Sequence, residues 1–172
     1  PPGGKIHRNA RGNPTGVLID AAIQLVSQHL PPPTEDEIAE ATLLAARECL
    51  QYGLTSVQDM GVSEQEIRVY KKLIDQQRFP IRLYAAIDGV GETWKKYLQT
   101  GPEVGYGENR LTVLAIKLYM DGALGSRGAA LIEPYSDDPC NRGLTQTTEE
   151  DFRATVDDAL VHGFQVCTHA IG

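Results

Sequence analysis

The chain has 172 residues, a hydrophobic content of 41% and a formal net charge of −7. Its length allows one domain with a buried core, and its composition is that of an ordinary globular protein. The net negative charge, with no clustered basic face, argues against a nucleic-acid partner. No apolar run approaches the roughly 18 residues of a membrane-spanning helix, so we expect no membrane partner either.

The first stretch, residues 4–20, places the turn-forming letters "ARGNPTG" between two short apolar pieces. This pattern predicts a β-hairpin. The prolines of Pro31–Thr34 then interrupt the chain. We assign residues 1–30 to a separate hairpin and linker segment.

Three predicted helices share one N-terminal signal, a hydroxyl residue followed three positions later by an acid, which is typical of a capping box. The pairs are Thr34 with Glu37, Ser63 with Glu66, and Thr148 with Asp151. Gly53 and Gly163 are placed to end the first and third helices, and Pro80 to end the second. A shorter helix is predicted over residues 91–100.

A strand is predicted after each helix, over residues 54–60, 81–87, 111–120 and 164–171. Strands that alternate with helices at this spacing indicate parallel βα units. A doubly wound sheet and a (β/α)8 barrel both fit this pattern, but the turn after the first of these strands lacks the dinucleotide-binding glycines. We therefore predict an α/β fold, a partial (β/α)8 TIM barrel of about four βα units over residues 31–172.

The three cysteines, Cys49, Cys140 and Cys167, are odd in number and far apart. Because they fit neither a disulfide framework nor a zinc knuckle, we expect a reducing, cytoplasmic location. The chain has no initiating methionine and stops directly after a predicted strand. We expect it to be a fragment of a longer protein.

Function in α/β folds lies at the C-terminal ends of the strands. This rule selects five residues: Asp59, Asp88, Lys117, Asp121 and His169. For Asp59, capping of the following loop is the favoured interpretation. Asp121 precedes a glycine, so it either forms a turn or orients a ligand or substrate.

Lys117 lies in an otherwise apolar strand, where alternation turns it toward the barrel interior. An unpaired buried ammonium is costly, so it must shift its pKa, find a partner or be modified. The ordinary alternative is a lysine that reaches solvent at a strand end. Two functional roles suit a desolvated lysine: a Schiff base with a carbonyl substrate, or a carbamate that bridges two metal ions.

His169 ends the last predicted strand, a position typical of metal ligands, although a core histidine bonded to the backbone is the alternative. Arg127 lies in the long loop that follows Lys117, on the same face. It could bind a substrate carboxylate or shape the pocket.

The segment "AIKLYMDGALGSRGAALIEPYSDDP" resembles the signature of amidohydrolase family 3, in the branch that includes N-substituted formamide deformylases. The pieces "PPGGKIHRNARGNPTGVL", "GLTSVQDMG" and "THAIG" are similar to the same branch and occur in the same order. The resemblance therefore covers nearly the whole chain.

This resemblance implies a metal-dependent hydrolase on a (β/α)8 barrel, with a small β domain beside it. It implies that Lys117 is a bridging carbamate formed with carbon dioxide, that His169 is a metal ligand, and that one or two divalent ions, zinc by expectation, are bound. We also predict a catalytic role for Asp121 and a substrate-binding role for Arg127. The family's H-x-H, second late histidine and closing aspartate have no counterpart here, so we expect the 172 residues alone to be inactive.

The implied reaction is attack of metal-activated water on an amide-type carbonyl of a small-molecule substrate. Two alternatives stay open. The first is a lyase on the same barrel that uses Lys117 as a Schiff-base nucleophile. The second is a non-catalytic half-barrel whose exposed strand edges lead to self-association as a homo-oligomer.

Overall fold

The computed structural model of the protein describes residues 3–172. Within it the chain packs as two compact units, which we describe separately. The loop unit contains the described residues up to Pro31, together with Tyr119–Arg153 and Thr168–Gly172. The sheet unit contains Pro32–Leu118 and Ala154–Cys167.

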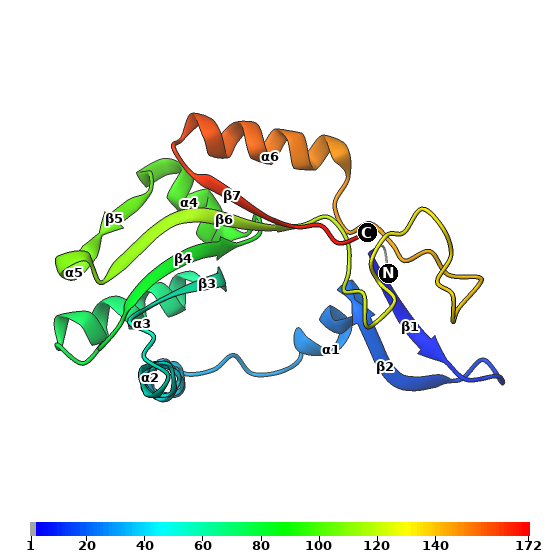
Figure 1. The fold of residues 1–172 in the computed structure, drawn as a ribbon, viewed down its shortest axis with the longest axis horizontal. Coiled ribbons are helices and arrows are strands. Elements are labelled where there is room, and N and C mark those ends of the chain that lie inside the picture. Colours follow the sequence, from blue (N-terminus) through cyan, green and yellow to red (C-terminus); the bar gives the residue numbers. More distant parts are fainter. Residues whose placement is uncertain (1–2) are drawn as a thin grey trace. The chain divides into compact units, whose positions relative to one another are not determined.

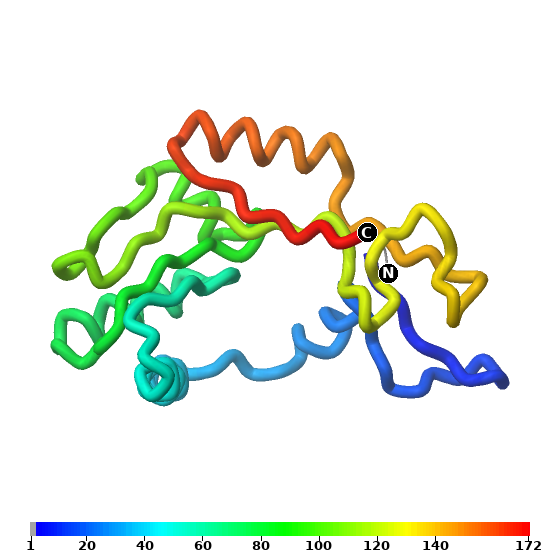
Figure 2. Tube along the Cα trace, viewed as in Figure 1, coloured from blue at the N-terminus to red at the C-terminus, as the bar shows by residue number. Residues whose placement is uncertain are grey.

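The loop unit begins with the predicted hairpin, which is confirmed. Strands β1 (Gly4–Arg8) and β2 (Pro14–Asp20) pair antiparallel. A single 3-10 turn, η1 (Ala21–Ile23), and the short helix α1 (Gln24–Ser27) follow β2. The long connection between β6 and α6, traced in Figure 2, contains no helix or strand and is held by isolated bridges such as Asp121 to Thr145.

The sheet has five strands (Figure 1). Three of them, β3 (Ser56–Val62), β4 (Arg82–Asp88) and β6 (Leu111–Tyr119), are neighbours in that order and run parallel. Strand β7 (Gln165–His169) also pairs with β6. The short strand β5 (Glu103–Gly105) pairs antiparallel with β6 as well. The four predicted strands are thus confirmed as part of a mixed α/β fold with a parallel sheet. Strand β5 and the turn α5 (Tyr106–Asn109) were not predicted.

Four longer helices connect the strands: α2 (Glu35–Gln51), α3 (Glu64–Asp75), α4 (Glu92–Thr100) and α6 (Glu149–Val161). The capping boxes at Thr34 and Ser63 are confirmed, and the Thr148 hydroxyl accepts from the Asp151 N–H at 3.1 Å. The predicted stop at Pro80 is wrong, because α3 ends at Asp75 and Gln77 turns the chain with a φ of 57°. Pro80 instead precedes β4.

Strand β6 lies in the core, since Leu111, Val113, Ala115 and Ile116 are all fully buried. Its pairing with β4 skips one residue, because Ala85 faces Val113 and the next residue of β4 faces Ala115. Beyond this bulge the alternation follows the predicted pattern, with Lys117 half-buried between buried neighbours.

Across residues 3–172, no helix combines the length and the apolar character that a membrane span requires. The longest, α2, has 17 residues and exposes charged side chains. It also exposes two apolar side chains, Leu44 and Leu50.

Candidate functional site

Asp121 follows β6 and is 3% exposed. Its Oδ2 accepts hydrogen bonds from the backbone N–H groups of Ala130 at 2.9 Å and Gly172 at 2.7 Å, and its Oδ1 accepts from Ile171 at 3.0 Å. Burial alone would raise the pKa of this carboxyl, but the three donors and nearby His169 lower it below its usual value. Asp121 is therefore an ionised anchor that ties the loop after β6 to the residues after β7.

His169 lies beside this anchor in the loop unit. Its Nε2 is 3.2 Å from the carbonyl oxygen of Gly122 and 3.8 Å from Oδ1 of Asp121. A carbonyl can only accept, so Nε2 carries a hydrogen, and in the neutral form of the ring Nδ1 has the lone pair. The structure thus brings together two predicted site residues, Asp121 and His169. It orients the imidazole through the Gly122 carbonyl, in the way that backbone carbonyls orient metal-ligating histidines.

Asp20, at the end of β2, completes this cluster and was missed by the sequence analysis. Burial raises the pKa of its carboxyl, while His169 lowers it and Asp121 raises it further. The signal was available, because "LID" places an acid at the end of an apolar strand, as at the selected aspartates. The rule was applied only to strands of the predicted barrel. We call Asp20, Asp121, Gly122, Gly128 and His169 the aspartate–histidine cluster.

Lys117 lies in the sheet unit, paired across the β4–β6 ladder with Asp88. Its Nζ donates to the carbonyl of Leu118 at 3.1 Å. Desolvation lowers the pKa of the Lys117 ammonium, and the nearby Cys167 and Asp88 oppose this shift. Lys117 and Asp88, both selected by the strand-end rule, are therefore adjacent, and Cys167 is a further neighbour of Lys117.

Asp59 lies in β3, where its Oδ2 accepts from the hydroxyl of Tyr70 at 2.9 Å. Desolvation raises the pKa of Asp59, while the bond from Tyr70 opposes the shift. The pair borders a cavity of about 370 Å³ between α2 and the sheet, whose other lining is mainly apolar. Asp59 therefore has a structural role, but through Tyr70 of α3 and not as the predicted cap of the following loop.

Arg127 lies in the loop unit with a φ of 56°. Its Nε and Nη2 donate to the two carboxylate oxygens of Asp137, at 3.1 Å and 2.7 Å. The guanidinium therefore already binds a carboxylate of its own chain. Asp137 raises the pKa of Arg127, and both side chains are exposed.

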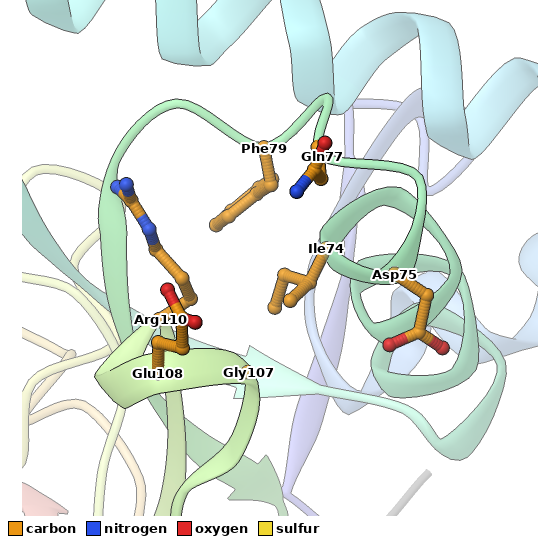
Figure 3. A pocket seen from close by; sticks show the side chains of 7 residues that line it. All are labelled: Ile74, Asp75, Gln77, Phe79, Gly107, Glu108 and Arg110. Carbon is orange, nitrogen blue, oxygen red and sulfur yellow. The ribbon is translucent and has the colours of Figure 1, made fainter.

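A second cavity, of about 330 Å³, lies at the C-terminal end of α3 and contains none of the predicted site residues. Figure 3 shows the apolar side chains of Ile74 and Phe79 pointing into it. Arg110, on its rim, donates to the carbonyl of Pro80 at 3.3 Å.

The donor chemistry of two residues fits a divalent metal: an imidazole at His169 that the Gly122 carbonyl orients, and a lysine of lowered pKa at Lys117. Within residues 3–172, however, no three His, Cys, Asp or Glu side chains are grouped so that they could hold a metal ion. The described residues therefore do not form a metal site by themselves.

A family model and two curated proteins match the whole chain. A family model described as "Amidohydrolase family" matches residues 1–172. YtcJ of Bacillus subtilis (strain 168), a protein named as an amidohydrolase, is 32% identical over 179 residues, which cover 100% of this chain and 32% of YtcJ. Protein LONG AFTER FAR-RED 3 of Arabidopsis thaliana is 32% identical over 185 residues, which cover 100% of this chain and 31% of that protein. The chain thus spans about a third of the length of these curated relatives.

Two crystal structures share the fold, and both are of uncharacterized metal-dependent hydrolases. The one from Pyrococcus horikoshii OT3 has a TM-score of 0.77 and 28% identity, and the match covers 97% of this chain and 35% of that one. The one from Pyrococcus furiosus has a TM-score of 0.74 and 24% identity, with 90% and 33% covered, and supports the fold alone.

Proposed function

Because this chain belongs to the amidohydrolase family, we propose that it forms part of a metal-dependent enzyme that hydrolyses an amide-type C–N bond. The observation that carries this proposal is the imidazole of His169, whose Nε2–H is held by the Gly122 carbonyl so that Nδ1 can act as a ligand. Similarity to metal-dependent hydrolases over nearly the whole chain supports it. Similarity of residues 115–139 to the formamide deformylase-like branch leads us to propose a small-molecule amide substrate.

The proposed architecture is a partial (β/α)8 barrel of about four βα units over residues 31–172. It is supported by the parallel order of β3, β4 and β6, with β7 beside β6. In this proposal residues 1–30 belong to a small β domain, which is supported by their separate hairpin.

Lys117 and His169 are the proposed protein ligands of one or two divalent ions, with zinc expected. Desolvation lowers the pKa of Lys117, which increases the neutral amine that can react with carbon dioxide. In that reaction a bond forms between Nζ and the carbon of carbon dioxide, a proton is released and an anionic carbamate results. A divalent ion in such a site would supply an activated water and polarise the substrate carbonyl.

Asp121 and Arg127 have proposed roles beside these ligands. Both oxygens of Asp121 accept backbone N–H groups, so we assign its catalytic contribution to positioning of the loops around His169. Arg127 is the proposed substrate contact, with Asp137 orienting its guanidinium. The free state of Cys49, Cys140 and Cys167 supports the proposed cytoplasmic location.

The test uses a protein of the length of the curated relatives, which includes this chain. Bound metal is measured after purification, and amide hydrolysis is compared between wild type and Lys117→Ala. We expect bound zinc or another divalent ion and a loss of hydrolysis in Lys117→Ala. The matched control is Lys95→Ala, because Lys95 forms only an exposed salt bridge with Glu92. Absence of metal together with full activity of Lys117→Ala would refute the proposal.

The same preparation separates the Schiff-base alternative, which the lowered pKa of Lys117 also favours. A lyase of that kind would give a borohydride-trapped adduct on Lys117 and would be insensitive to chelators. A hydrolase would lose activity on chelation and give no adduct. The isolated 172 residues should be inactive in both assays, because their described part groups no three metal-ligating side chains.

A further inference from the structure

Asp20 has an unusual backbone for a residue with a side chain. Its φ is 50° and its ψ is −128°, which is outside the left-handed helical region that aspartate tolerates. Such conformations persist only where the surrounding structure holds them, and they are concentrated at functional sites. In Asp20 this conformation ends β2 and directs the chain into η1.

The carboxylate of Asp20 has an unmet hydrogen-bonding requirement. Its Oδ2 is buried and has no hydrogen-bond partner among the described residues. Buried polar atoms of this kind are rare in folded proteins, and each calls for an explanation. If Asp20 served only to form the turn, a neutral side chain in its place would make the protein more stable.

Two glycines of the loop after β6 form the wall against which this carboxylate packs. A Cβ on Gly122 would lie 2.8 Å from Cγ of Asp20, and a Cβ on Gly128 would lie 3.3 Å from it, with Oδ2 closer in both cases. Only residues without a side chain leave room for the carboxylate there. The two glycines also bond to each other, through the Gly122 N–H and the Gly128 carbonyl at 3.2 Å.

Gly122 links Asp20 to the imidazole. The face of Gly122 touches the Asp20 carboxylate, and its carbonyl accepts the Nε2–H of His169. His169 also acts on Asp20 through space, since it lowers the pKa of the Asp20 carboxyl. Asp20 is therefore coupled to His169 by packing and by charge.

We propose that Asp20 is a positioning residue for His169, which holds the Gly122 carbonyl in place and so fixes the imidazole with Nδ1 free to bind a metal ion. This inference rests on the proposed function. Asp20 also lies within range of a charge interaction with His169, and carboxylates around a metal-ligating histidine strengthen it as a ligand. The hairpin would then contribute directly to the hydrolase site.

The test is Zn²⁺ binding by the whole enzyme after its metal has been removed with a chelator. Asp20→Asn keeps the volume and removes the charge, and Asp20→Ala is a second variant that empties the space between the glycines. We expect Zn²⁺ affinity to fall roughly 10- to 100-fold in both, as for other partners of metal-ligating histidines. Asp157→Asn is the matched control, because Asp157 is an exposed aspartate of α6.

Two further measurements separate positioning from a general structural role. The nitrogen chemical shifts of His169 in the metal-free enzyme should report one Nε2–H tautomer in the wild type and a mixture in Asp20→Asn. In a His169→Ala background, Asp20→Asn should cause no further loss of Zn²⁺ affinity, because the two residues act as one unit.

The outcomes are distinguishable. A wild-type enzyme that binds no Zn²⁺ and hydrolyses no amide would overturn the proposed function, and this inference with it. Normal wild-type binding with unchanged affinity and an unchanged tautomer in both Asp20 variants would overturn this inference alone. So would an affinity loss that persists in the His169→Ala background, since Asp20 would then act on the fold rather than on the imidazole.

Discussion

Asp59 in the sheet unit and Asp121 in the loop unit both lie near a strand end, but their pKa values shift in opposite directions. Asp59 accepts a hydroxyl from Tyr70, and desolvation raises its pKa. Asp121 is only 3% exposed, yet its pKa is lowered, because three backbone N–H groups point at its two oxygens. The number of donors, and not the degree of burial, decides the direction of the shift.

Asp59 and Asp121 also have different roles in the molecule. Burial raises the pKa of the Tyr70 hydroxyl, with a further contribution from Asp59, so the proton stays on the phenol and the pair acts as a packed structural element. Asp121 holds a permanent charge next to His169 and connects chain segments far apart in sequence. We expect substitutions at Asp121 to affect folding and the site together, and substitutions at Asp59 to affect stability alone.

The largest expected effect is that of Asp121→Ala. It removes the acceptor for three backbone donors, and each buried donor left unpaired costs about 1–3 kcal/mol. Because the donors are only partly buried, we expect a total loss of roughly 2–4 kcal/mol in the free energy of unfolding. Denaturant unfolding measures it, with the exposed Asp157→Ala as control. If both variants lose the same free energy of unfolding, water accepts the three N–H groups as well as Asp121 does.

Gly122→Ala should come next. Its new methyl group would collide with the Asp20 carboxylate, and overpacking of this kind costs about 1–3 kcal/mol. Gly125→Ala is a control in the same loop, because a Cβ there meets nothing within 4 Å, and it should change stability by no more than about 0.5 kcal/mol. The comparison is made by thermal and denaturant unfolding. Equal stability of the two variants would show that the loop moves freely away from Asp20.

The features that the sequence predicted well are local. Thr34 and Ser63 each cap a helix through a residue three positions away, so the signal and its partner lie in one short window. The hairpin and the four strands were predicted for the same reason, from alternation and turn residues. The turn at α5 was not predicted from the sequence, because Glu108 and Asn109 adopt φ values of 59° and 65°, which few residues other than glycine adopt.

The site was predictable only in part. The strand-end rule selects Asp121 and His169, but it cannot show that the Asp121 donors come from Ile171 and Gly172, about 50 residues away. Asp20 also ends a strand, but that strand lies outside the predicted barrel, and only the fold brings Gly122 and Gly128 to it. The strand positions of Lys117 and His169 offered metal-ligand roles among alternatives, family resemblance selected these roles, and they remain predictions.

Tyr70→Phe tests the other half of the comparison. Tyr70 is 5% exposed, and its hydroxyl is a donor to the partly buried Asp59 carboxylate. Removing it leaves a desolvated carboxylate without that donor, and we expect a loss of about 1–2 kcal/mol in the free energy of unfolding at neutral pH. Tyr52→Phe is the matched control, since Tyr52 is 76% exposed. If both variants unfold alike, the Asp59–Tyr70 bond does not stabilise the sheet unit.

The smallest expected effect is that of Asp59→Asn, and its dependence on pH is its main readout. The pKa of Asp59 is raised above the unfolded value of 3.8, so the folded state retains a proton that the unfolded chain releases. The contribution of Asp59 is therefore fully present below pH 3.8 and is lost as the pH rises through the folded pKa. Asparagine can still accept the Tyr70 hydroxyl and carries no charge, so the variant should gain on the wild type as pH rises, by on the order of 1 kcal/mol. Unfolding of both proteins across this pH range measures the gain. A variant less stable than the wild type at neutral pH would mean that donors besides Tyr70 support the Asp59 charge, and the contrast with Asp121 would then disappear.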